Sequence, residues 1–75
     1  MELKIGGRYC HHKGREYIVI GVARDSDTLE ELVVYQALYD SQEFGDNARW
    51  VRSKEKFLEN IMIDGKARPR FKFIE

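Results

Sequence analysis

The sequence predicts a mainly β fold, a small SH3-like and partly open barrel of about five strands with one short helical turn. Three observations support this fold class. Short segments of alternating or continuous apolar residues recur along the chain, turn-forming residues separate them, and one segment after Ser53 suits a helical turn. The chain has 75 residues with no linker, repeat or low-complexity stretch, so we expect one domain over residues 1–75.

Two strands are expected in the first third of the chain. The first covers residues 8–12 and ends in a loop around Gly14, a residue that can adopt a positive φ. The second covers residues 16–24 and is almost entirely apolar, which is typical of a strand covered at least in part on both faces. Gly21 in its middle predicts a bulge or a sharp bend, and a bent strand suits a small barrel.

A third strand is expected over residues 31–39, because the β-branched and aromatic run Val33-Val34-Tyr35 outweighs the helix-compatible residues around it. Alternation divides this strand into two faces. We assign one face to the core and the other to a half-exposed surface or a second core layer. The core set is Leu32, Val34, Gln36 and Leu38, and the other set is Val33, Tyr35, Ala37 and Tyr39.

The second half of the chain predicts two more strands, over residues 48–52 and 70–74. Between them, Ser53 can cap a helical turn over residues 54–59. Asp64-Gly65 directly follows an apolar run, which is a strong hairpin signal. The pattern as a whole predicts a core formed by Tyr17, Val19, Ile20, Leu32, Val34, Leu38, Val51, Phe57 and Phe71.

Composition excludes several classes of protein. Hydrophobic residues make up 43% of the chain, but no apolar run approaches the ~18–20 residues that a membrane span needs. The segment Met1–Gly6 has no apolar stretch of the kind found in signal peptides. The single cysteine cannot form an internal disulfide, so we expect a cytoplasmic protein without a membrane partner.

Charge is balanced overall, with 13 basic and 13 acidic residues, which argues against general nucleic-acid binding. Its distribution is uneven. Residues 1–24 carry five basic and two acidic groups, residues 25–46 carry seven acidic and no basic groups, and residues 47–75 carry eight basic and four acidic groups. Two interpretations remain open: neighbouring strands that neutralise each other, or a basic face opposite an acidic one.

Several motifs occur in a specific order along the chain. They are Gly7-Arg8-Tyr9-Cys10-His11-His12-Lys13-Gly14, Tyr17-Ile18-Val19, Val33-Val34-Tyr35-Gln36-Ala37-Leu38-Tyr39, Trp50-Val51-Arg52 and Pro69-Arg70-Phe71. Together they resemble a small bacterial family, domain-of-unknown-function family 1653. His12 stands where that family usually has an aromatic residue, and Ser53 stands where a proline is expected. The resemblance assigns no chemistry, so it implies no catalytic or cofactor-binding residues.

Three groups of residues are candidates for a catalytic, metal or phosphate site. Cys10, His11 and His12 could begin a zinc site or a thiol dyad, but a structural zinc needs four ligands and a dyad needs an orienting third group. The acidic turn lacks the spacing of a calcium loop, and Gly6-Gly7 lacks the context of a phosphate loop. We therefore expect no catalytic, metal or cofactor site and no enzymatic activity. The acidic turn contains Asp25, Asp27, Glu30 and Glu31.

Aromatic and basic residues form the most promising constellation. If the third and fourth strands are antiparallel neighbours, their side chains could form one exposed strip, in which rings stack and arginines bind anions. The alternative is that the rings belong to the core and the arginines lie over them. The candidate binding residues are Tyr35, Tyr39, Trp50, Arg52, Arg68 and Arg70.

Two functions follow from these observations. The first is a non-catalytic binding module whose partner is a peptide or a nucleic acid. The alternative is a structural or accessory domain that acts by self-association, as a homo-oligomer, or by docking onto an enzyme. An exposed aromatic strip would favour the first function, and a large apolar patch on one sheet face would favour the second.

Overall fold

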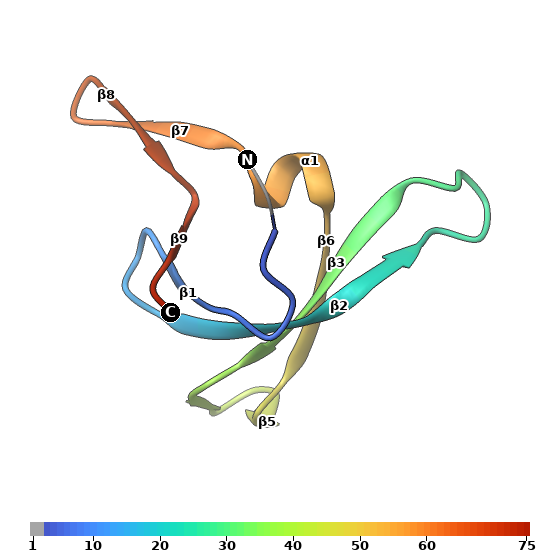
Figure 1. The fold of residues 1–75 in the computed structure, drawn as a ribbon. Coiled ribbons are helices and arrows are strands. Elements are labelled where there is room, and N and C mark those ends of the chain that lie inside the picture. Colours follow the sequence, from blue (N-terminus) through green and yellow to red (C-terminus); the bar gives the residue numbers. More distant parts are fainter. Residues whose placement is uncertain (1–2) are drawn as a thin grey trace.

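The computed structural model describes residues 3–75, which form one curved antiparallel sheet, two small hairpins and one helical turn (Figure 1). Met1 and Glu2 lie outside the described residues. They belong to the segment of residues 1–6 for which we expect no signal peptide. The elements are β1 (Arg8–His11), β2 (Glu16–Arg24), β3 (Glu31–Ala37), β4 (Asp40–Ser41), β5 (Gly45–Asp46), β6 (Arg49–Ser53), α1 (Lys54–Phe57), β7 (Asn60–Ile63), β8 (Lys66–Pro69) and β9 (Phe71–Phe73).

The main sheet has the strand order β6-β3-β2-β1-β9, and all neighbouring strands are antiparallel. Its five strands are those predicted from the sequence, with boundaries within two residues. β7 and β8 form the hairpin that Asp64-Gly65 indicates, and both turn residues have positive φ, 51° and 77°. The hairpin of β4 and β5 was not predicted, because each of its strands has only two polar or glycine residues.

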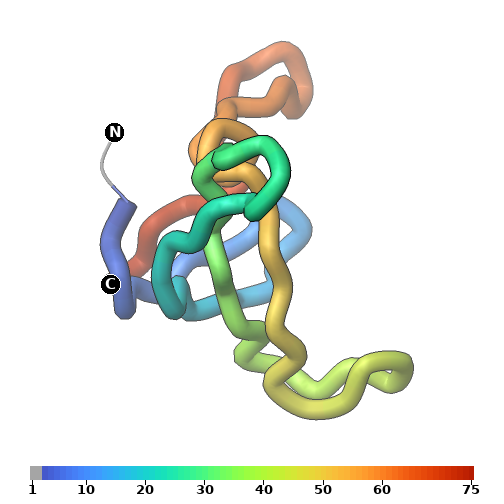
Figure 2. Tube along the Cα trace, turned by 90° about the vertical axis from the view of Figure 1, so that its right-hand side faces the viewer, coloured from blue at the N-terminus to red at the C-terminus, as the bar shows by residue number. Residues whose placement is uncertain are grey.

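The sheet is not closed into a barrel, so the SH3-like barrel is not confirmed. Among residues 3–75, β6 and β9 are the edge strands and do not pair with each other. Instead, α1 and the β7–β8 hairpin connect one edge to the other, and the hairpin extends away from the sheet (Figures 1 and 2). The register shift between Val19 and Gly21 is the bulge that the glycine predicted, and it bends the long strand β2.

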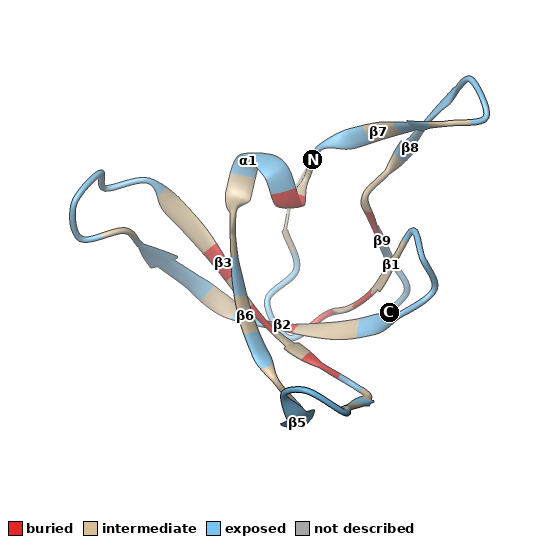
Figure 3. Cartoon of the chain, turned by 180° about the vertical axis from the view of Figure 1, so that it is seen from behind, coloured by how far each residue is buried: buried red, intermediate tan, exposed pale blue. Residues whose placement is uncertain are grey.

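Aromatic side chains form most of the core, which lies on one face of the sheet, here called the inner face. Figure 3 marks the buried positions along the strands and in α1. The rings of Phe57 and Phe71 stack with centroids 4.2 Å apart, and Tyr35 packs against both. Phe57 reaches this cluster from α1, where the Ser53 hydroxyl accepts a hydrogen bond from the Lys56 N–H at 3.2 Å. The helix therefore places the Phe57 ring over the sheet. It is shorter than the turn predicted over residues 54–59.

The inner face of β3 is the opposite of the predicted one. Val33, Tyr35 and Ala37 are buried, whereas Leu38 on the other face is 41% exposed. Alternation correctly separated the two sets but could not say which one faces inward. The large rings of neighbouring strands decide this, because Tyr35 completes an aromatic core that aliphatic side chains would leave underfilled.

The predicted core changes accordingly. Val19, Phe57 and Phe71 are buried as expected, and Tyr17, Leu32 and Val34 are half-buried. Ile20, Leu38 and Val51 are exposed on the sheet surface, so their prediction as core residues was wrong. Within residues 3–75, no helix has the length and apolar character to cross a membrane.

Candidate ligand-binding surfaces

Strands β3 and β6 bring three of the predicted binding residues together on the inner face. Tyr35 is the cross-strand partner of Trp50, and Arg52 lies two residues further along β6, opposite Val33. The Arg52 Nε donates to the Tyr35 hydroxyl at 3.5 Å, and the guanidinium lies 5.7 Å from the centroid of the Phe71 ring. Within residues 3–75, no carboxylate forms an ion pair with Arg52, so its charge remains free to bind an anion.

Tyr35 itself is 6% exposed and belongs to the core. It offers no stacking surface and instead positions Arg52 through its hydroxyl. Tyr39 contacts Tyr17, and their hydroxyl oxygens are 2.7 Å apart. The Tyr17 ring in turn packs against Tyr35. Burial, with the hydrogen bond to Tyr39, raises the pKa of Tyr17. The Arg15 guanidinium lies over the Tyr39 ring, 4.5 Å from its centroid, so this ring already stacks on a cation.

Trp50 is half-buried and contacts an aromatic residue that sequence reasoning missed. The Phe44 ring stands perpendicular to the indole, with centroids 5.0 Å apart, and this residue is 56% exposed. Phe44 is the only apolar residue between positions 40 and 47, which was the available signal. The Trp50 Nε1 is buried and has no hydrogen-bond partner within residues 3–75. Tyr39, Phe44, Trp50 and Arg52 are called the aromatic–arginine surface below.

The remaining two predicted residues lie elsewhere. Arg70 directly precedes β9 and forms an ion pair with Glu59 at 3.1 Å, so its charge is partly neutralised. Arg68 lies on β8 and lines a separate cavity. The six predicted residues therefore do not form one continuous strip, since the chain between β6 and β9 leaves the sheet through α1 and the β7–β8 hairpin.

His11 reports the electrostatics of the region near Arg52 and Arg70. Burial, followed by the positive charges of His12, Arg52, Arg70 and Lys13, lowers the pKa of His11 from 6.5 to about 4. Its ring packs edge-on against Phe71 at 4.9 Å, and its Nδ1 accepts from the Lys13 N–H at 3.2 Å. The imidazole is therefore neutral at pH 7, and it lies in a positive potential.

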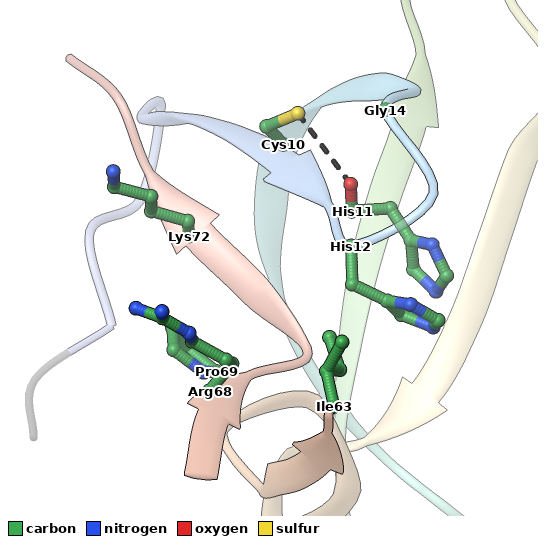
Figure 4. A pocket seen from close by; sticks show the side chains of 8 residues that line it. All are labelled: Cys10, His11, His12, Gly14, Ile63, Arg68, Pro69 and Lys72. Carbon is green, nitrogen blue, oxygen red and sulfur yellow. Dashed lines mark hydrogen bonds between the residues drawn. The ribbon is translucent and has the colours of Figure 1, made fainter. Parts of the chain in front are cut away.

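A cavity of about 430 Å³ opens between the β1–β2 loop and the β7–β8 hairpin (Figure 4). Cys10 lines it, and the Cys10 thiol donates weakly to the His11 carbonyl at 3.5 Å. No three His, Cys, Asp or Glu side chains of residues 3–75 are grouped to hold a metal ion, and this includes the Cys10-His11-His12 run. The cavity is lined by Cys10, His11, His12, Gly14, Ile63, Arg68, Pro69 and Lys72.

Among residues 3–75, no strand pairs with the edge of β6 that points away from β3, so this backbone edge is free. The Ala37 N–H donates to the Ala48 carbonyl at 2.8 Å, and the register continues from this pair along β6. In an antiparallel ladder, alternate residues bond to the neighbouring strand, so the backbone groups of Arg49 and Val51 point away from β3. Val51 is 61% exposed, which leaves this edge open.

Comparison with known proteins places the chain in context. Residues 7–73 match a family described as protein of unknown function (DUF1653). The crystal structure of a protein belonging to DUF1653 from Bordetella bronchiseptica is similar, with a TM-score of 0.83 and 29% sequence identity. The similarity covers 97% of this chain and 88% of that chain. No curated protein matches the chain.

Proposed function

We propose, on the premise that the chain belongs to the DUF1653 family of proteins of unknown function, that it is a non-catalytic module that binds an extended peptide along β6. The observation that carries the proposal is the free edge of β6, with Trp50 and Arg52 on its inner face. An extended peptide can add to such an edge as a further antiparallel strand. We place this activity in the cytoplasm, as expected from the single cysteine.

The backbone supplies the sequence-independent part of the affinity. The outward N–H and C=O groups of Arg49 and Val51 would pair with one peptide segment, in the same way that the inward groups of β6 pair with β3. The exposed edge runs directly beside the aromatic–arginine surface, so a bound strand would place alternate side chains over it.

The side chains supply specificity. An apolar or aromatic peptide residue would pack against Trp50 and Phe44. A carboxylate, from Asp, Glu or a carboxyl terminus, would bind Arg52. The β4–β5 hairpin that carries Phe44 also carries Asp40, Glu43 and Asp46 and no basic residue, so it favours a Lys or Arg at that end of the peptide.

The same hairpin argues against a nucleic acid as the main partner. Its three carboxylates lie in the segment that presents Phe44, where they would repel a phosphate backbone. A peptide of mixed charge is complementary to both ends of the surface, the acidic hairpin and the unpaired Arg52. An oligonucleotide is complementary only to the Arg52 end.

The experiment is a titration of Trp50 fluorescence with a mixed library of extended peptides at low salt, with short single-stranded oligonucleotides as the second arm. We expect a shift in emission with peptides that combine a basic, an aromatic and an acidic residue, at micromolar concentrations. Arg52→Gln should weaken binding about tenfold, because it removes a charged hydrogen bond.

Val51 provides a matched pair of variants for the backbone contribution. Val51→Pro removes an outward N–H and should abolish peptide binding, whereas Val51→Ala should preserve it; both should remain folded, because proline is tolerated at an outward position of an edge strand. Equal binding by both variants would contradict strand addition. A response to oligonucleotides alone would contradict the choice of a peptide.

Self-association is the second candidate, and one observation favours it. The outer face of the sheet exposes Ile20 at 45% and Val51 at 61%, next to the half-buried Val34. A second copy could cover these aliphatic side chains or pair with β6 edge to edge. Sedimentation velocity of the wild type and of Val51→Lys measures this. A dimer that the lysine disrupts would support self-association, and a monomer at high concentration would exclude it.

A further inference from the structure

We infer that the cavity between the β1–β2 loop and the β7–β8 hairpin is a second, separate binding site, which takes a small organic phosphate. It does not depend on peptide binding, because it shares no residue with the aromatic–arginine surface. Its volume, about 430 Å³, lies within the range of ligand pockets, roughly 300–1,000 Å³.

The charge of the lining residues determines which charge a ligand of the cavity should carry. Arg68 and Lys72 are cationic, and the lining contains no carboxylate. Neither side chain forms an ion pair within residues 3–75, in contrast to Arg70, which Glu59 partly neutralises. Two unneutralised cations at one cavity favour a dianion. A phosphate monoester carries about −1.5 to −2 charges at neutral pH and so suits them better than a carboxylate does.

The arrangement of the lining indicates what the phosphate is attached to. Figure 4 shows the side chains of Arg68 and Lys72 extending to one side, whereas the imidazoles of His11 and His12 lie on the other. The two imidazole centroids are 4.2 Å apart, and Ile63 adds an apolar side chain on the imidazole side, whereas Pro69 lies beside Arg68 (Figure 4). A ligand with a phosphate at one end and a compact, flat or apolar group at the other matches this division.

Cys10 makes the inference directly testable, because it is the only thiol of the chain and lines the cavity. The first measurement compares the alkylation rates of Cys10 by iodoacetate, an anion, and by iodoacetamide, which is neutral. Both reagents attack the thiolate. The rate with iodoacetate divided by the rate with iodoacetamide is therefore independent of any change in the thiolate fraction. Lys72→Gln and Arg68→Gln should each lower the ratio about threefold, because each removes one nearby positive charge.

The second measurement is protection of Cys10 from iodoacetamide by phenyl phosphate, inorganic phosphate and benzyl alcohol. Phenyl phosphate should protect at the lowest concentration, because it alone presents both the anion and the ring. The concentration for half-protection should rise about tenfold in Lys72→Gln. Lys66→Gln is the control: it removes a positive charge from the hairpin that carries Arg68, at a residue outside the lining, and both measurements should stay unchanged.

Three outcomes would overturn the inference. One is the absence of protection by phenyl phosphate up to about 10 mM at low salt, which corresponds to no useful affinity. The second is equal protection by inorganic phosphate, which would reduce the site to non-specific anion attraction. The third is an equal loss in Lys66→Gln, which would show that overall charge, and not the cavity, attracts the anion.

Discussion

Val33 and Val34 are adjacent on β3 and face opposite sides of the sheet. Val33 is fully buried, and Val34 is half-buried on the outer face. Val33→Ala should therefore lower the free energy of unfolding by about 2 kcal/mol, because it removes buried methyl groups and leaves a cavity. Val34→Ala should cost clearly less. Chemical denaturation of both variants measures the difference. An equal cost, or a larger cost for Val34→Ala, would contradict the assignment of Val33 to the inner face of β3.

His11 gives the protein a pH dependence with a defined window. Its pKa is about 4 in the folded state against 6.5 for a free imidazole, so the unfolded chain takes up a proton between these values and the folded chain does not. The contribution of His11 to stability is therefore fully present above pH 6.5 and falls as the pH decreases toward 4. Melting temperatures at several pH values should show this loss.

His11→Asn is the control for that window, because the amide oxygen can still accept the Lys13 N–H. Its melting temperature should vary less between pH 6.5 and 4. Asp25 acts in a different range: hydrogen bonds from the backbone N–H groups of Asp27 and Thr28 lower the pKa of its carboxyl below the ordinary 3.8. A wild type whose stability does not change between pH 7 and 4 would contradict the burial of a neutral His11.

Two glycines of the sheet region have opposite tolerance for a side chain. A Cβ at Gly7 would lie 2.8 Å from Phe73 Cε1 and 2.9 Å from the Lys4 carbonyl oxygen, whereas a Cβ at Gly21 would meet nothing within 4 Å. We expect Gly7→Ala to lower the melting temperature by several degrees through steric displacement of the segment before β1. Gly21→Ala should be neutral or slightly stabilising, because alanine restricts the unfolded chain. Thermal melts of the two variants side by side test this, and equal effects would contradict it.

Elements with strong local signals were predictable, and those defined by distant contacts were not. Val33-Val34-Tyr35 identified a strand, and Asp64-Gly65 identified a hairpin, because both signals act within a few residues. The two-residue strands β4 and β5 have no such signal. The inward face of β3 depends on rings from β1, β9 and α1, so alternation alone could not determine it.

The same distinction explains the candidate site. The proximity of Tyr35, Trp50 and Arg52 was predicted on the condition that the third and fourth strands are antiparallel neighbours, and the pairing of β3 with β6 meets that condition. Phe44 was missed, because its ring reaches Trp50 across a loop whose path the sequence does not indicate. Arg68 was grouped with the wrong surface, since its place depends on how the β7–β8 hairpin leaves the sheet.

The whole molecule depends on β1, which joins the two ends of the fold. β1 lies between β2 and β9, so the last strand of the chain completes the sheet beside the first. The Arg8 N–H donates to the Glu75 carbonyl at 2.8 Å, and the Ile74 N–H donates to the Arg8 carbonyl at 2.8 Å. A chain that ends at Arg70 loses Phe71 from the core and should be largely unfolded at 25 °C.

A chain that ends at Phe73 is the matched truncation. It retains Phe71 and loses the two hydrogen bonds to Arg8 together with the Arg8–Glu75 ion pair, which is 2.6 Å long and solvent-exposed. It should remain folded with a modest loss of stability, about 1–3 kcal/mol. Circular dichroism and denaturant titration of the two truncations test this. A folded chain ending at Arg70 would show that the sheet does not need its last strand.

The β7–β8 hairpin has one further consequence, for the rates at which backbone hydrogens exchange with solvent. Its strands pair only with each other within residues 3–75, and Met62 is 70% exposed. Such a unit opens without unfolding the sheet, so its amides should exchange long before those of Val19 and Val33. The hairpin also supplies Ile63 and Arg68 to the cavity, so a molecule bound there would stabilise the paired state of the hairpin against local opening. Occupancy would then appear as slower exchange at a hairpin that lies outside the main sheet.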